Sequence, residues 1–341
     1  MQRIRVDINC QRKRITAPLT LVLGLSCVSC SSRRKHGNWG LFDFLRLLFC
    51  PSTCTSVRLT GFPTRRSAPG PACAAKLNLW MHHSSKTDPA GDIRNYYAAL
   101  YRAWGPQHWW PAETQFEVIA GAYLTQNTSW MNVQRALANL RRANLLSLEG
   151  IRAVKVSRLQ RLIRPSGYFR QKARRLKTFV SFLDRQYDGS LDKLFAQPTE
   201  KLREELLSLN GVGPETADSI LLYAGNHPVF VVDAYTRRIL DRHEIVSEKT
   251  DYEEIRQLFQ VALEPIADKQ ERGPAEVREP LESGIHGAAH PPSAMSTAHR
   301  TAWAQVYNEM HGLIVGVGKN YCRKAKPSCE GCPLQKFLPG K

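Results

Sequence analysis

The sequence has nine cysteines in 341 residues, yet none lies between Cys73 and Cys322. This gap excludes a disulfide framework across the main body of the chain and favours a reducing compartment. No apolar run is long enough to cross a bilayer, so we expect no membrane partner. The alternating pattern of strands is nearly absent as well, and residues 229–232 are its best short candidate.

Acidic residues are scarce at the start of the chain. Residues 1–80 hold 13 of the 48 basic residues but only 2 of the 30 acidic ones, so most of the net charge of +18 lies there. The excess of +7 that remains in residues 81–341 is compatible with a DNA or RNA partner, whose phosphates attract clustered Lys and Arg.

Residues 1–88 differ from the rest of the chain, where strong patterning begins near Met81. Basic residues before the apolar stretch 15–28 resemble a signal peptide, and the Arg- and Ser-rich composition resembles an organellar transit peptide. A third interpretation is an extension upstream of a true start at Met81. We predict a disordered leader or extension here, with a cytoplasmic, nucleoid-associated location if the protein is bacterial and targeting left open.

Apolar residues recur at three- and four-residue spacing along most of the chain after residue 91, which is typical of amphipathic helices. The predicted fold class is therefore all-α. The Pro- and Gly-containing segment 269–297 has no such period and predicts a flexible insertion. The predicted helices cover residues 92–104, 114–125, 130–143, 168–187, 199–209, 214–224, 234–243, 252–263 and 298–315.

A glycine-rich turn joins two of these helices at residues 209–217. Gly211 and Gly213 permit a tight turn with positive φ angles, and Pro214 suits the first position of the next helix. The N–H groups of the turn and of the helix start could receive a phosphate. The alternative is an ordinary helical hairpin without a ligand.

Asp233 ends the apolar run 229–232 and begins the next predicted helix, where an acid can simply be an N-cap. The hairpin and Asp233 at this separation resemble the helix-hairpin-helix (HhH-GPD) DNA glycosylase superfamily, in its endonuclease III-like branch. Residues 120–127, residues 167–173 and the spacing Cys322-x6-Cys329-x2-Cys332 also resemble this superfamily. The resemblance implies two helical domains with a DNA-binding cleft between them. One would be a six-helix domain at residues 108–227, and the other would combine residues 89–107 with residues 228–341.

The resemblance implies a catalytic role for Asp233, whose carboxylate would stabilise the oxocarbenium character of the sugar while orienting or deprotonating a water. Glu215 stands where bifunctional members carry a lysine. Because a carboxylate cannot form a Schiff base, the sequence predicts a monofunctional glycosylase without AP lyase activity. Glu215 can also be an exposed first-turn acid that the helix dipole favours.

The same resemblance places Gln126 where the superfamily inserts a polar residue into the space left by the flipped base. The alternative for Gln126 is a polar residue at a helix C-terminus. The hairpin residues Gly211, Val212, Gly213 and Thr216 would contact the DNA backbone. A basic stretch follows residue 163, in which we expect mostly solvated side chains with one or two phosphate contacts: Arg164, Arg170, Lys172, Arg174, Arg175 and Lys177.

Two adjacent tryptophans, Trp109 and Trp110, precede the first helix of the central domain. They are similar to the Trp-Trp-Pro of the bacterial 3-methyladenine DNA glycosylase III group and would stack on the flipped base, although core packing is the alternative. Indole faces attract a cationic N-alkylated purine. We therefore expect an enzyme that acts on alkylated purines in double-stranded DNA. We also expect the protein to be a monomer. The rival hypotheses are an endonuclease III-type glycosylase and lyase for oxidised pyrimidines, and a non-catalytic DNA-binding relative.

Cys322, Cys329 and Cys332 match the superfamily's iron–sulfur spacing at three positions, but Leu338 occupies the fourth. Since [4Fe–4S] clusters normally take four thiolates, three interpretations stay open. They are a cluster whose fourth ligand comes from elsewhere or from solvent, a metal-free remnant, and a zinc site that a histidine completes.

Overall fold

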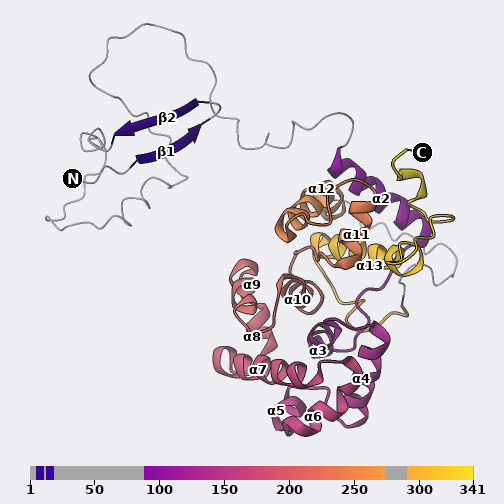
Figure 1. Cartoon of the computed structure of the whole chain (residues 1–341). Helices are drawn as coiled ribbons and strands as arrows, with labels where there is room; N and C mark the ends of the chain where they lie inside the picture. The colour runs from indigo at the N-terminus through magenta and orange to yellow at the C-terminus, as the bar shows by residue number, and fades with distance from the viewer. Residues whose placement is uncertain (1–4, 11–12, 19–87, 273–289, 341) are drawn as a thin grey trace. The chain divides into compact units, whose positions relative to one another are not determined.

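The computed structural model describes residues 5–10, 13–18, 88–272 and 290–340 (Figure 1). Contacts divide the chain into two compact units, residues 1–83 and 84–341. The first unit contains an antiparallel hairpin of β1 (Arg5–Cys10) and β2 (Lys13–Pro18). This hairpin differs from the predicted disordered leader, although a two-stranded sheet alone is marginally stable in water. The other residues of the predicted leader, 1–4, 11–12 and 19–87, lie outside the described residues, apart from Asp88.

The second unit confirms the predicted all-α class, since every regular element described in residues 88–340 is helical. Residues 229–232 form an irregular buried segment and not a strand. The helices are α2 (Pro89–Trp104), α3 (Gln115–Thr125), α4 (Trp130–Arg142), α5 (Leu148–Ala153), α6 (Val156–Leu162), η2 (Arg164–Ser166), α7 (Phe169–Tyr187), α8 (Leu191–Phe195), α9 (Thr199–Leu207), α10 (Pro214–Ser219), η3 (Ile220–Ala224), α11 (Ala234–Arg242), α12 (Tyr252–Arg272), α13 (Ala302–Asn320) and η4 (Gln335–Phe337).

The short helices α5, α6 and α8 were not predicted. None is longer than seven residues, so their apolar residues complete too few turns to show a helical period. Serine N-caps fix two of them: the Ser147 hydroxyl accepts from Gly150 N at 3.0 Å and the Ser190 hydroxyl accepts from Lys193 N at 3.2 Å. Helix α12 also extends beyond its predicted end at residue 263, through Pro265, to Arg272.

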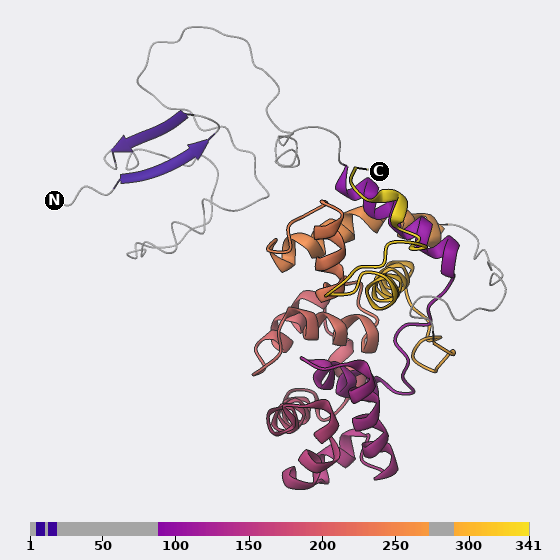
Figure 2. The ribbon, with the colours of Figure 1, turned by 45° about the vertical axis from the view of Figure 1, so that its right-hand side comes forward.

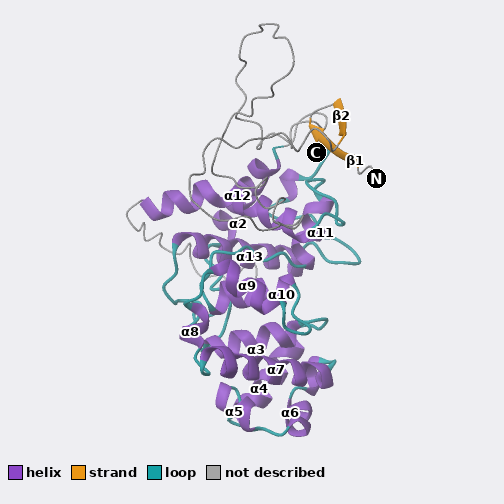
Figure 3. Cartoon of the chain, turned by 90° about the vertical axis from the view of Figure 1, so that its left-hand side faces the viewer, coloured by secondary structure: helices purple, strands orange, loops and turns teal. Residues whose placement is uncertain are grey.

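The helices pack in two groups (Figures 1 and 2). The terminal group consists of α2, α11, α12 and α13, which contact one another, and the central group consists of the helices from α3 to α10. η3 connects the groups because it contacts α3, α9 and α10 as well as α13. In Figure 3, α5 and α6 lie at the end of the central group away from α12. Contacts join both groups into one unit, so the predicted domain boundaries stay a prediction.

Part of the predicted flexible insertion is packed against the main body. His290 N donates to Gln107 O at 3.1 Å, and Met295 N donates to Ala112 O at 3.0 Å. The Met295 side chain is buried. Residues 290–297 therefore line the segment that carries both tryptophans, while residues 269–272 end α12 and residues 273–289 lie outside the described residues. Among the described helices, none combines the length and apolar character that crossing a membrane requires.

Candidate active site

The hairpin between α9 and α10 has a positive φ angle at only one of its two glycines, because Gly213 is extended with φ −98°. Gly211 has φ +80°, and a Cβ at this position would lie 2.0 Å from Arg175 Nε. Gly213 is the N-cap of α10, and Pro214 occupies the first turn. Val212 differs from the prediction of a backbone donor to DNA, because its N–H donates to Leu209 O at 3.0 Å and its side chain is buried. The exposed Gly213 and the start of α10 are the parts of the turn that remain open to an anion.

Gln126 at the end of α3 is tied to this hairpin. Its Nε2 donates to Gly211 O at 2.9 Å and to Thr216 Oγ1 at 3.0 Å. Arg175 donates to Gln126 Oε1 at 2.5 Å. The structure therefore brings together Gln126, Gly211 and Thr216, which were predicted to contact DNA. The side chains of Gln126 and Thr216, however, hydrogen-bond to each other. Their roles toward DNA stay predictions.

Lys172 differs from its neighbours in the basic stretch. Its side chain is buried, and Nζ donates to Leu124 O at 2.9 Å and to Ser166 O at 2.6 Å. Burial lowers the pKa of Lys172 to about 8. Lys172 therefore satisfies carbonyls at the ends of α3 and η2 and does not reach a phosphate.

Asp233 is both the N-cap of α11 and the centre of a polar cluster. Oδ1 accepts from Thr236 N at 2.8 Å and from Thr236 Oγ1 at 2.9 Å. The Asp233 N–H donates in return to Thr236 Oγ1 at 3.5 Å, which completes a capping box. Oδ2 lies 3.7 Å from His311 Nε2, and the side chain is 13% exposed. The carboxylate thus uses one oxygen to begin the helix and directs the other toward residues of α13.

The groups around Asp233 come from η3, α10 and α13. His311 is 4% exposed, and its Nδ1 is 2.7 Å from the Tyr223 hydroxyl. Burial lowers the pKa of His311, although the Asp233 charge opposes this shift, so the ring is neutral at pH 7. A neutral His311 that accepts from Tyr223 at Nδ1 presents its Nε2–H to Asp233. The separation of 3.7 Å is too long for a hydrogen bond, so Tyr223 fixes the His311 ring and the ring lies beside Oδ2 without holding it.

Two further ionisable groups feel the Asp233 charge. Burial lowers the pKa of Lys319, while Asp233 opposes the shift. Burial, followed by the Asp233 charge, raises the pKa of Glu215 above its usual range, but the exposed surface of Glu215 lets solvent limit this rise. Asp233, Glu215 and Lys319 therefore form a coupled set of charges.

Both predicted tryptophans belong to an aromatic cluster beside this set and are 6% exposed. The Trp109 ring centroid is 6.2 Å from that of His311 and 5.5 Å from that of Trp110. Lys319 Nζ lies over the Trp109 ring, 5.5 Å from its centroid. The Trp110 ring packs against Trp130 at 5.0 Å and against Tyr223 at 5.2 Å. Trp109 is thus the tryptophan that contacts His311 and Lys319, whereas Trp110 packs against Trp130 and Tyr223.

Three members of the site were missed from the sequence: Tyr223, His311 and Lys319. His311 and Lys319 lie eight residues apart on α13, a spacing that places them on the same side of a helix. The available signal was the polar content of a helix that is otherwise apolar and buried. Only the packing of α13 against η3 and α11 shows that these side chains reach Asp233.

Comparison with known proteins agrees with this geometry. Residues 120–265 match the protein family described as "HhH-GPD superfamily base excision DNA repair protein". The Methanocaldococcus jannaschii protein MJ1434, named as a candidate DNA repair glycosylase, is 40% identical over 251 residues, which are 73% of this chain and 96% of that protein. The chain belongs to the HhH-GPD superfamily of base excision DNA repair proteins. The predicted resemblance is confirmed, and the protein is a DNA glycosylase of this superfamily.

Other HhH-GPD relatives and solved structures extend the comparison. The Arabidopsis thaliana endonuclease III homolog 1 is 26% identical over 230 residues, but the chain spans only about half of that protein's length, with 67% of this chain covered. The Helicobacter pylori 3-methyladenine DNA glycosylase MagIII bound to 1,N6-ethenoadenine aligns with a TM-score of 0.53 and 28% identity, over 68% of this chain and 98% of that one. A non-covalent endonuclease III–DNA complex has a TM-score of 0.54 at 19% identity, over 73% of this chain and 95% of that one, which shows the shared fold.

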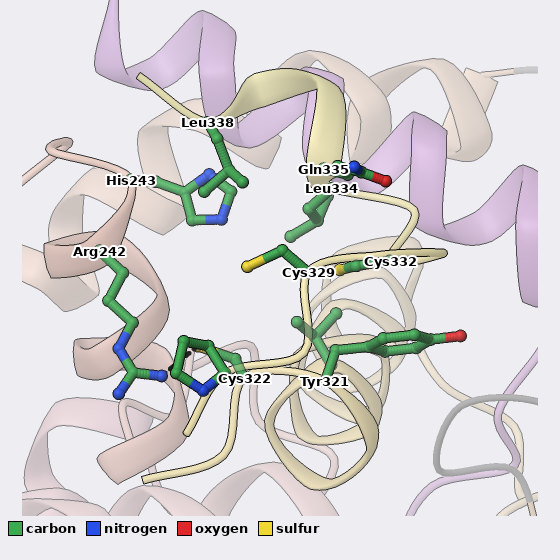
Figure 4. A pocket seen from close by; sticks show the side chains of 11 residues that line it. Arg242, His243, Tyr321, Cys322, Cys329, Cys332, Leu334, Gln335 and Leu338 are labelled. Atoms are coloured by element: carbon green, nitrogen blue, oxygen red, sulfur yellow. Dashed lines mark hydrogen bonds between the residues drawn. The ribbon is translucent and has the colours of Figure 1, made fainter. Parts of the chain in front are cut away.

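The cysteine loop was the remaining HhH-GPD feature predicted from the sequence. Cys322, Cys329, Cys332 and Leu338 line one cavity of about 260 Å³ together with Arg242 and His243 (Figure 4). Within the described residues, no three His, Cys, Asp or Glu side chains converge closely enough to hold a single metal ion. This arrangement of side chains does not fit the zinc interpretation, which needs the ligands to converge on one ion. An iron–sulfur cluster, in contrast, needs thiolates spread around a cavity, because each binds a separate iron. Three cysteines fit that requirement and Leu338 does not.

Proposed function

We propose that this DNA glycosylase hydrolyses the N-glycosidic bond of an alkylated purine that has flipped out of double-stranded DNA, and that it does not cleave the strand. The observation that carries the proposal is the divided use of the Asp233 carboxylate. Thr236 holds Oδ1 with two hydrogen bonds, while Oδ2 is directed toward His311. An anchored carboxylate with one oxygen outside the helix cap can stabilise positive charge on a sugar or orient a water.

The surroundings support this role for Asp233. The neutral His311 imidazole and the Tyr223 hydroxyl form a buried hydrogen-bonded pair behind the carboxylate. The pair keeps the His311 ring in place beside Oδ2, while the bonds from Thr236 hold the carboxylate before the DNA binds, so little reorganisation accompanies the reaction. All of these residues belong to one chain, so a monomer would suffice.

The aromatic cluster supports a cationic base as the substrate. Lys319 Nζ already lies over the face of Trp109 at 5.5 Å from the ring centroid. The same indole face would suit an N-alkylated purine, which carries positive charge, once Lys319 has moved away from it. Such a base is a good leaving group and needs little help from a general acid. MagIII, a structural neighbour at 28% identity, is named as a 3-methyladenine DNA glycosylase and was solved with a modified adenine, which favours a purine.

The absence of lyase activity rests on Glu215, which replaces the amine of the bifunctional branch. One observation favours the alternative, a glycosylase with AP lyase activity. Lys319 is an amine that interacts with Asp233. Burial lowers the pKa of Lys319, which increases the fraction of its side chain that is neutral and nucleophilic. The alternative function would therefore act through Lys319 and not through residue 215.

Duplex oligonucleotides with a single defined lesion separate these functions. The lesions are 7-methylguanine, 1,N6-ethenoadenine, thymine glycol and an abasic site, and each product is analysed with and without alkali. We expect release of the alkylated purine, strand breaks only after alkali treatment, and no borohydride-trapped adduct. Breaks without alkali that disappear in Lys319→Met would support the lyase alternative. Binding without release of any base would leave the non-catalytic DNA-binding hypothesis.

A further inference from the structure

The cavity beside the cysteine loop is lined by an imidazole as well as by thiols. His243 ends α11 as its C-cap residue, and it lines the same cavity as Cys322, Cys329 and Cys332. Figure 4 shows the Cys329 sulfur and the ring edge of His243 directed into one space. Leu338, at the spacing of the missing fourth cysteine, also faces this space but has no donor atom. The lining therefore contains three thiols and one imidazole, together with the polar side chains of Arg242, Tyr321 and Gln335.

The orientation of His243 is fixed from the side away from the cavity. Its Nδ1 is 2.8 Å from the Tyr96 hydroxyl, and the two ring centroids are 5.2 Å apart at 67°. The other nitrogen, Nε2, lies on the cavity side of the ring (Figure 4). Metal-binding histidines almost always have their second ring nitrogen hydrogen-bonded in this way, because the bond fixes the tautomer and the direction of the ligand.

Arg242, next to His243 in the chain, holds the cysteine loop against α11. It donates to Arg323 O at 2.8 Å and to Lys324 O at 3.0 Å. One of its nitrogens is also 3.3 Å from Cys322 Sγ. Arg238 adds a hydrogen bond from Nε to Cys322 O at 2.7 Å. The loop is therefore fastened to the helix that carries His243, and a guanidinium group lies beside a thiol that would become a thiolate on binding iron.

We propose that His243 Nε2 is the fourth ligand of the iron–sulfur cluster that the cysteine spacing predicts at Cys322, Cys329 and Cys332. Imidazole is a suitable ligand for iron, and histidine replaces cysteine in some iron–sulfur centres, where it raises the reduction potential. Donors around a cavity suit a cluster, whereas a single ion would need them to converge. This inference concerns the cysteine loop and does not depend on which base the enzyme releases.

The test uses the full-length chain, reconstituted with ferrous iron and sulfide without oxygen. The measurements are iron and sulfide per chain, together with the pulsed EPR spectrum of the reduced protein. We expect about four irons per chain in the wild type and a nitrogen coupling from a bound imidazole. His243→Ala should lose the nitrogen coupling and fall to about three irons, with the EPR signal of an oxidised three-iron cluster.

Leu338→Cys provides the matched control because it restores a thiol at the fourth position. The double variant His243→Ala, Leu338→Cys should regain about four irons without the nitrogen coupling, and its reduction potential should be lower than that of the wild type. If the double variant does not regain its iron, the loss in His243→Ala comes from damage to the fold. His243 then only supports the fold, and the assignment is overturned. A nitrogen coupling that persists in His243→Ala, or a wild type that binds no iron and sulfide, would overturn it as well.

Discussion

Replacing Asp233 with Asn tests the catalytic assignment with little disturbance of the fold. An Asn side chain keeps the oxygen that accepts from Thr236 N at 2.8 Å, and Asn and Asp are about equally good N-caps. We therefore expect the free energy of unfolding to change by less than about 0.5 kcal/mol. The phosphate-binding hairpin is unaltered, so DNA affinity should stay close to that of the wild type.

The expected loss of rate follows from the charge that Asn lacks. A carboxylate about 4 Å from a unit positive charge contributes about 4 kcal/mol at an effective dielectric constant of 20. The sugar carries only part of a unit charge in the transition state, and loss of one such group commonly costs about 100-fold or more. We expect base release to slow at least about 100-fold, which corresponds to about 2.7 kcal/mol.

The assay is release of 7-methylguanine from a duplex in a single turnover, alongside DNA affinity by fluorescence anisotropy and the melting temperature. Asp251→Asn is the matched control, because Asp251 accepts from Glu253 N at 2.8 Å at the start of α12 and is not part of the site. Asp251→Asn should keep the wild-type rate. If Asp233→Asn also releases the base at the wild-type rate, Asp233 is only a helix cap and the reasoning is refuted.

Four further variants test other parts of the site and of the fold. Glu215→Lys should introduce borohydride-trappable adducts at low yield, and their absence would show that residue 215 does not reach the sugar. Burial raises the pKa of Glu309 to about 7, so this acid keeps its proton in the fold at a pH where the unfolded chain has lost it. Stability should fall as pH rises from about 4.5 to 7, and Glu309→Gln should flatten that slope in urea unfolding and stabilise the fold at pH 8 by at most about 3 kcal/mol. Gly211→Ala should destabilise the fold by about 1–2 kcal/mol, because φ is +80° and the Cβ meets Arg175, and it should weaken DNA binding. Lys172→Met should cost about 1–3 kcal/mol in urea unfolding but leave the salt dependence of DNA binding unchanged; a shallower salt slope would show a phosphate contact.

The sequence alone determined the features that depend on local rules. Apolar spacing predicted the long helices, since a helix with one buried face must repeat that spacing. Gly211 and Pro214 predicted the turn and the start of α10, because few other residues suit those backbone angles. Asp233 was recognised as a helix start with a candidate catalytic carboxylate, and the comparisons confirm the superfamily to which its motif pointed.

Only the tertiary structure decided which distant side chains share a site. His311 and Lys319 reach Asp233 because α13 packs against α11 and η3, and no local pattern specifies that packing. Burial reversed two predictions from residue type: Lys172 satisfies carbonyls inside the protein, and part of the predicted insertion covers the segment of Trp109. A charged or polar side chain inside the fold must find a partner there. Its role therefore depends on neighbours that are remote in sequence and meet only after the helices have packed.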